Sequence, residues 1–423
     1  MNGNMMQLLQ RIKGLTADFL DRNGTVDDGE LMRFIEEEAF RHGAGLSVAE
    51  KRAVIQRVFN SFRGMDILQP YLDDPEVTEI MVNRHDEIFI EKKGEIVRVE
   101  ERFDHPGKLE DLIQTIVGRV NRIVNESSPI VDARLPDGSR VNVVLPPLSL
   151  KGPTLTIRRF PEKPMTLRDL QESGTLTGEA AQLLERLVRA KYNIFISGGT
   201  SSGKTTMLNA LGNCIPRDER VITIEDSAEL QFPNIPNLVR LETRNANAEG
   251  RGSIGMSVLI RTALRMRPNR IVIGEVRGGE AADMLQAMNT GHEGSLSTGH
   301  ANSCRDMLSR LETMVLSGVQ LPLAVIRQQL VSALDIMVHL NRLRDGRRVV
   351  TEIAELVALK EQDYVLRPLF QWVDGTLQPT GETLVHTEKL KRAEEADDRF
   401  VLRCLGNEEE PFILAGEAGA GGL

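Results

Sequence analysis

The sequence contains few cysteines, and their arrangement excludes two classes of site. The three cysteines, Cys214, Cys304 and Cys404, are far apart and odd in number. This pattern fits neither a disulfide framework nor the paired spacing of zinc ligands. We therefore expect a reducing, cytoplasmic location.

Long apolar stretches are absent as well. No run reaches the roughly 20 apolar residues that a membrane-spanning helix needs, so we expect no integral membrane segment. The N-terminus lacks a basic region followed by an apolar core, which argues against a secretory signal. Any association with a membrane is therefore expected to be peripheral.

Positive charge and aromatic side chains are also scarce. Acidic residues number 61 against 52 basic ones, which gives a formal net charge of −9, and only 4% of residues are aromatic. A negative chain disfavours nonspecific binding to a polyanion, and few aromatic side chains are available to stack on bases. We expect no nucleic-acid partner, although a local basic groove is not excluded and a nucleic-acid translocase stays as an alternative.

The patterning of the 423 residues divides the chain into several parts. Residues 1–70 have apolar residues at helical spacing and predict a helical region. Residues 71–160 combine short β-like runs, among them ARLPDG at 133–138, with one helical stretch, which predicts a smaller α+β domain. Residues 161–166 contain two prolines and predict a short, stiff linker.

Beyond the linker, helical and strand patterns alternate through residues 167–360. Such alternation predicts an α/β domain with a mostly parallel sheet covered by helices. From about Thr351 the pattern weakens, and residues 361–423 are predicted to form a C-terminal extension. Its small-residue end, AGEAGAGGL, is expected to be disordered.

The strongest chemical signal is GGTSSGKTT, which has phosphate-loop spacing between an apolar strand and a helix. Its glycines let backbone amides face the phosphates, helped by the positive end of the helix dipole. Lys204 is expected to contact the β- and γ-phosphates, and the Thr205 hydroxyl to ligate magnesium. The predicted nucleotide-binding residues are Gly198, Gly199, Thr200, Ser201, Ser202, Gly203, Lys204, Thr205 and Thr206.

Two carboxylates are expected to complete the site. Glu275 ends the strand pattern RIVIGE, where it can orient or deprotonate the attacking water. Gly274 stands where an aspartate often holds magnesium, so we assign that role to Glu225, at the end of VITIE. Asp226 and Glu229 follow, and their acids suit helix capping as well as function.

His300 ends a third strand pattern, SLSTGH. A lone histidine is more often structural than catalytic, but its place at a strand end favours a role in the site. It is expected to sense the γ-phosphate or to bind the acidic residues.

Taken together, GGTSSGKTT, VITIEDSAEL, RPNRIVIGEVRGGEA and STGHANS resemble the Walker A, Asp box, atypical Walker B and His box motifs of the secretion ATPase superfamily. This superfamily comprises the hexameric motors of type II and type IV secretion and of type IV pili. The similarity covers roughly residues 77–353. The runs RVNVVLPPLSLKGPTLTIRRF, LETR and LRMRPNR look most like the CpaF branch, which powers tight-adherence (Flp) pili.

The resemblance implies a RecA-like P-loop ATPase domain, preceded by the helical appendage and by a PAS-like α+β domain that closes over the nucleotide. It also implies ATP and Mg²⁺ as cofactors, a hexamer as the active form, and an inner-membrane platform protein as the partner. Arg134, Arg140, Arg158 and Arg159 would pair with phosphate oxygens, although each one alone fits a solvent-facing or salt-bridged position equally well. A scaffold that binds ATP without turnover is the remaining alternative.

Overall fold

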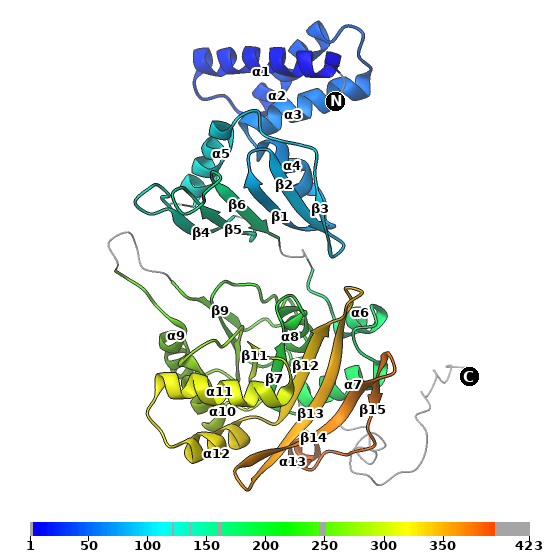
Figure 1. Ribbon diagram of the computed structural model, residues 1–423, viewed down its shortest axis with the longest axis vertical. Helices are drawn as coiled ribbons and strands as arrows, with labels where there is room; N and C mark the ends of the chain where they lie inside the picture. The colour runs from blue at the N-terminus through cyan, green and yellow to red at the C-terminus, as the bar shows by residue number, and fades with distance from the viewer. Residues whose placement is uncertain (1–2, 121, 136, 160–162, 245–250, 394–423) are drawn as a thin grey trace, which may run out of the picture. The chain divides into compact units, whose positions relative to one another are not determined.

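The chain forms two compact units, Met1–Glu162 and Lys163–Leu423, and each is described by itself. No helix in the described part of the chain is both long and apolar enough to cross a membrane. Cys404 and the small-residue tail that we expect to be disordered lie outside the described residues. The computed structural model (Figure 1) describes residues 3–120, 122–135, 137–159, 163–244 and 251–393.

The first unit begins with three helices, α1 (Gly3–Asn23), α2 (Asp28–His42) and α3 (Val48–Phe62). A capping box between Ser47 and Glu50 begins α3, because each side chain bonds the other residue's backbone N–H. The apolar faces of the three helices share one core, to which Leu8, Ile12, Leu31, Ile35, Val54 and Val58 contribute. The expected helical region is therefore a small bundle.

A short connection, η1 (Asp66–Leu68) and α4 (Gln69–Asp73), leads from the bundle into an antiparallel sheet. The strand order is β3-β2-β1-β6-β5-β4. Helix α5 (Pro106–Arg119) shares a core with the sheet's buried residues. The strands are β1 (Val77–Arg84), β2 (Glu87–Lys92), β3 (Glu95–Arg98), β4 (Ile130–Arg134), β5 (Arg140–Val144) and β6 (Thr154–Arg158).

The expected strand at residues 133–138 is wrong in its placement. Strand β4 ends at Arg134, and the chain then turns through Gly138, whose φ of 93° suits a glycine, into β5. Ala133 and Arg134 of this run thus end one strand, and Gly138 lies in the turn of a hairpin. As a result Arg134 and Arg140 lie directly opposite each other.

The second unit contains a nine-stranded sheet in the order β15-β14-β13-β12-β7-β11-β10-β8-β9. The part from β12 to β9 is parallel, and β13 to β15 add an antiparallel extension. Its strands are β7 (Ile194–Gly198), β8 (Val221–Glu225), β9 (Leu238–Glu242), β10 (Arg270–Ile273), β11 (Leu296–His300), β12 (Ile336–Arg342), β13 (Arg348–Lys360), β14 (Asp363–Val373) and β15 (Thr376–Pro379).

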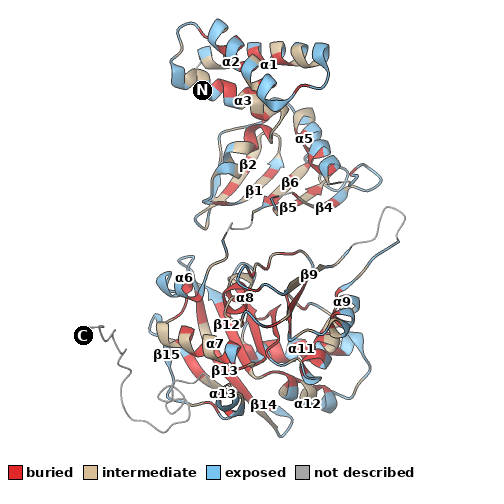
Figure 2. Ribbon diagram, turned by 180° about the vertical axis from the view of Figure 1, so that it is seen from behind, coloured by how far each residue is buried: buried red, intermediate tan, exposed pale blue. Residues whose placement is uncertain are grey.

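Helices cover the parallel strands, and the two faces of the sheet have separate cores. Every residue of β7, β8 and β10 is buried. The centre of the second unit is largely red in Figure 2. The mostly parallel α/β domain predicted from the sequence is confirmed. The helices are α6 (Leu167–Glu172), α7 (Gly178–Arg189), α8 (Lys204–Gly212), α9 (Met256–Ala263), the 3₁₀ turn η2 (Leu264–Met266), α10 (Glu280–Asn289), α11 (Cys304–Gly318), α12 (Leu323–Ala333) and α13 (Glu388–Arg392).

The C-terminal extension is more regular than the sequence pattern indicates. Strands β13 and β14, of 13 and 11 residues, are joined by a tight turn through Glu361 and Gln362, whose φ angles are 50° and 66°. A turn of this kind is usually made by Asn-Gly or Asp-Gly, so Glu-Gln gives little signal. The next turn, Asp374-Gly375, does carry that signal, and it leads into β15.

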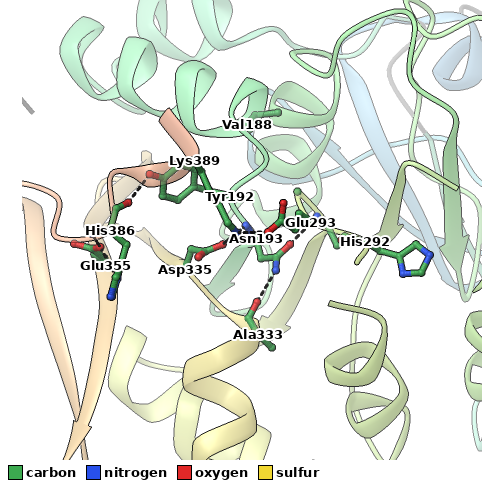
Figure 3. Close-up of polar contacts among 12 residues, drawn as sticks. Val188, Tyr192, Asn193, His292, Glu293, Ala333, Asp335, Glu355, His386 and Lys389 are labelled. Carbon is green, nitrogen blue, oxygen red and sulfur yellow. Dashed lines mark hydrogen bonds and ion pairs between the residues drawn. The ribbon is translucent and has the colours of Figure 1, made fainter. Parts of the chain in front are cut away.

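Figure 3 shows how the amino ends of the parallel strands are tied together. The Asn193 amide donates to the carbonyl of Ala333 at 2.7 Å and accepts from the N–H of Ser295 at 2.9 Å. Asp335 accepts from the N–H of Asn193 and from Lys389 of α13, both at 2.7 Å. The C-terminal segment is thereby fastened at the edge opposite the carboxyl ends of these strands, where ligands bind in α/β folds.

Candidate active site

The phosphate-loop residues lie between the buried strand β7 and helix α8, in the position that binds anions in such folds. Gly203 precedes the helix with a φ of 97°, which favours glycine. A Cβ atom at Gly198 would lie 2.5 Å from both the Leu340 carbonyl oxygen and the Ser202 hydroxyl. Close packing therefore requires glycine at Gly198 and backbone conformation favours it at Gly203, which agrees with the spacing of the motif.

Lys204, His300 and Glu275 form one continuous chain of polar contacts. The Lys204 ammonium donates to the Gly199 carbonyl at 2.8 Å and lies 3.2 Å from Nδ1 of His300. Nε2 of the same ring lies 2.9 Å from a carboxylate oxygen of Glu275. The ring thus connects the ammonium group of Lys204 with the carboxylate of Glu275.

Burial, with a further contribution from the nearby Lys204 charge, lowers the pKa of His300, and Glu275 opposes that shift. At neutral pH the ring is therefore uncharged. In the tautomer that lets Nδ1 accept from Lys204, Nε2 carries the hydrogen and lies 2.9 Å from Glu275. A change at Lys204 can therefore affect Glu275 through the His300 side chain alone.

Glu275 has a second partner that sequence reasoning missed. Nη2 of Arg277 lies 2.9 Å from its other carboxylate oxygen, and Nη1 of Arg277 lies 3.7 Å from Asp226. Arg277 thus joins acids that follow β10 and β8. Its position two residues after the candidate base was the only signal in the sequence.

Glu225 and Gly274 meet at the carboxyl ends of β8 and β10. One Glu225 oxygen accepts from the backbone N–H groups of Glu229 and Leu230, at 2.6 and 2.8 Å. A Cβ atom at Gly274 would lie 3.1 Å from Cγ of Glu225. The glycine before Glu275 therefore leaves the room that the Glu225 side chain occupies.

The second Glu225 oxygen suits a hard cation. Glu225 is 2% exposed, and its Oε1 is buried without a hydrogen-bond partner. Burial raises the pKa of Glu225 to about 7, although the hydrogen bonds from the two backbone N–H groups favour the ionised form. No cluster of three His, Cys, Asp or Glu that could hold a metal occurs among the described residues. Mg²⁺ needs none, since it is usually held by one or two protein oxygens together with substrate phosphates.

The helix-capping interpretation of Asp226 and Glu229 is wrong. Residues 226–237 contain no helix. Asp226 instead lies beside Arg277, and the backbone of Glu229 helps to fix the Glu225 carboxylate.

Arg134, Arg140 and Arg158 lie in the first unit and form a row across β4, β5 and β6. Arg134 is paired with Arg140, and Arg140 with Arg158. The neighbours Val141 and Ile157 are buried against α5, so the arginines occupy the other face of the sheet. The row thus places three positive side chains side by side on one face of the sheet.

The arginines differ in their partners. Arg134 donates through Nε to the Gly138 carbonyl at 3.1 Å, and the row ends where Arg158 meets Glu79 of β1. Arg159 differs from the others because it donates to the backbone carbonyls of Asp74 and Val77. We therefore give Arg159 a structural role and keep the other three as candidates.

A phosphate loop after a buried strand, with two glutamates at neighbouring strand ends of a mostly parallel sheet, defines a RecA-like P-loop nucleotide hydrolase. Residues 62–364, well over half of the chain, match the family described as type II/IV secretion system protein. The chain therefore belongs to this family, and it is an ATPase of the secretion superfamily whose motifs it carries.

Relatives agree with this assignment. A putative conjugal transfer protein of Mycobacterium tuberculosis is 37% identical over 299 residues, which cover 69% of this chain and 84% of that protein. The type IV secretion system protein VirB11 of Brucella suis is 35% identical over 339 residues, which cover 72% and 93% of the two chains. The crystal structure of the pilus retraction motor PilT with bound ADP has a TM-score of 0.50, 17% identity and coverage of 82% and 97%, and it bears on the fold alone.

Proposed function

We propose that the chain is a motor ATPase that hydrolyses ATP to power assembly of a type IV pilus of the tight-adherence kind, or type II or IV secretion. The contact chain from Lys204 through His300 to Glu275 is the observation that carries this proposal. A protein that only holds ATP has no need of a carboxylate linked to the phosphate-binding lysine. Phosphate release by the purified chain tests the enzymatic part.

The residues divide the work as follows. Lys204 and the amides at the start of α8 bind the β- and γ-phosphates. Thr205 and Glu225 would hold Mg²⁺, which neutralises charge on the phosphates when it is bound. Glu275 accepts a proton from the attacking water as the new oxygen–phosphorus bond forms and the bond to the ADP oxygen breaks. His300 keeps Glu275 oriented.

We expect a closed homo-oligomer, most simply a hexamer, as the active form. The secretion motors that the motifs resemble work as rings, and domain closure in one subunit needs a neighbour to act on. Light scattering should give about six times the 47.1 kDa of one chain under conditions of full specific activity. A monomer with full activity contradicts the ring.

The partner in this proposal is an inner-membrane platform protein, and the location is the cytoplasmic face of that membrane. The relation to the type IV secretion system protein VirB11 supports both assignments. A pull-down of membrane proteins with the ATP-trapped Glu275→Gln variant tests the partner.

DNA transport is a second candidate, and the name of the M. tuberculosis relative favours it. The net charge of −9 and the 4% aromatic content argue against a DNA channel. Stimulation of ATP hydrolysis by added DNA would support this candidate, and an unchanged rate would remove it.

The helical bundle is expected to be dispensable for ATP chemistry and to serve docking or ring positioning. None of the phosphate-handling residues lies there, and the family match begins at residue 62, where α3 ends. Deletion of residues 1–62 should leave nucleotide affinity within about twofold of the parent, which is within the ±0.5 kcal/mol of a remote change. Circular dichroism should confirm the fold of the truncated chain. Loss of nucleotide binding in a folded truncation would assign the bundle to the catalytic unit.

A further inference from the structure

The phosphate loop has two walls, one on each side of β7. In the parallel register, Gly198 is paired with His300 of β11 on one side and with Leu340 of β12 on the other. The hairpin that joins β12 to β13 lies on the second side. A Cβ atom at Gly203 would lie 3.7 Å from Cδ of Arg348, the first residue of β13.

Arg348 contacts the loop at a point of backbone strain. Its Nε donates to the carbonyl oxygen of Ser201 at 3.0 Å. Ser201 has a φ of 57°, in the left-handed region that costs a residue with a side chain roughly 1–2 kcal/mol. Strained residues of this kind persist where neighbours hold them, and they cluster at ligand sites. Arg348 is one such neighbour.

The hairpin is also strongly basic. Residues 342–348 contain four arginines and one acid. Arg347 is paired with that acid, Asp345, at 2.8 Å. Arg348 reaches the phosphate loop itself, where it donates to the Ser201 carbonyl.

The wall on the β11 side sets the direction of the bound nucleotide. Lys204, His300 and Glu275 mark the place of the γ-phosphate, because Glu275 must reach the attacking water. The phosphates closer to the ribose therefore extend away from β11, toward the hairpin. This step rests on the proposed function.

We propose that Arg348 is a further nucleotide-binding residue of this site, which pairs with a ribose-proximal phosphate while it holds Ser201. Arginine suits both tasks at once, since its planar fork presents several N–H donors in fixed directions. Arg348 acts in binding rather than in proton transfer, because it lies on the wall away from Glu275. Its loss should therefore affect affinity more than the rate of the chemical step.

Equilibrium binding of a fluorescent ADP analogue and steady-state ATP hydrolysis test this role in the full chain. Arg348→Ala should raise the Kd for ADP and the KM for ATP about tenfold, the lower end for a charge-assisted hydrogen bond, with kcat within about twofold. Arg348→Lys should recover part of the affinity, and the neutral Arg348→Gln should recover little. Arg347→Ala is the matched control, because it removes the same charge one residue away and should leave Kd unchanged.

Three outcomes would overturn the proposal. The first is a parent-like Kd for ADP in Arg348→Ala. The second is full recovery of affinity by Arg348→Gln, which would mean that Arg348 only holds Ser201. The third is an equal loss of affinity in Arg347→Ala, which would mean that only the overall positive charge of the hairpin matters. Since ADP binding needs no turnover, a parent chain that binds ADP but does not hydrolyse ATP would defeat the proposed function and still leave this test intact.

Discussion

Lys204→Ala should abolish nucleotide binding, whereas Glu275→Gln should retain it and block turnover. The first change removes the cation that pairs with the phosphates, and losing one partner of a desolvated charge pair costs roughly 2–5 kcal/mol. The second change removes only the acceptor of the water's proton, a contribution of about 10²–10⁴ in rate. Titration with a fluorescent ATP analogue and a phosphate-release assay measure the two effects.

The two variants control each other, since each alters one member of the same contact chain. Thermal unfolding should show that both are folded. Hydrolysis at the parent rate by Glu275→Gln means that the proposed base is wrong. Parent-like affinity in Lys204→Ala would show that the phosphates bind elsewhere.

Loss of an arginine from the row across β4, β5 and β6 should slow ATP hydrolysis far more than it weakens ADP binding. An arginine that reaches a phosphoryl transition state contributes a factor of order 10³ or more in rate. A surface salt bridge contributes only about 0–1 kcal/mol of stability. Single alanine variants of Arg134, Arg140 and Arg158 should therefore include at least one with a loss on the scale of 10³.

Arg98→Ala provides the matched control for the row. Arg98 lies on β3 of the same sheet, is exposed, and donates a long 3.4 Å bond to the Asp86 carbonyl. Its removal should leave turnover unchanged. If all three row variants stay within about twofold of the parent, far from the arginine-finger scale, the row belongs to the structure of the sheet and the coupling element lies elsewhere.

The fold of the second unit could be predicted because its signals are local. A buried strand, a glycine-rich loop and a helix follow one another within residues 194–212, and similar alternation continues along the chain. The strand predicted at residues 133–138 extends too far because only Ala133, Arg134 and Leu135 alternate between apolar and polar, and β4 ends at Arg134. The long strands β13 and β14 were missed because the turn at Glu361 and Gln362 has an unusual composition.

Several features of the candidate site depend on contacts between distant segments, which a single sequence does not reveal. Gly274 can be read as a missing aspartate until the structure places it against Glu225. Arg348 lies 147 residues from Ser201 in the chain, and only the pairing of β12 with β7 brings them together. The alignment of three arginines likewise requires the register of β6 against β5.

Steady-state phosphate release by the purified full-length chain tests the central claim most directly, with the oligomeric state recorded on the same sample. The account predicts steady hydrolysis of ATP when Mg²⁺ is present and its loss when excess chelator removes the metal, because Glu225 and Thr205 would then lack the ion that neutralises the phosphates. A chain that binds Mg²⁺ and ATP but releases no phosphate would contradict the account and identify the protein as a nucleotide-gated scaffold.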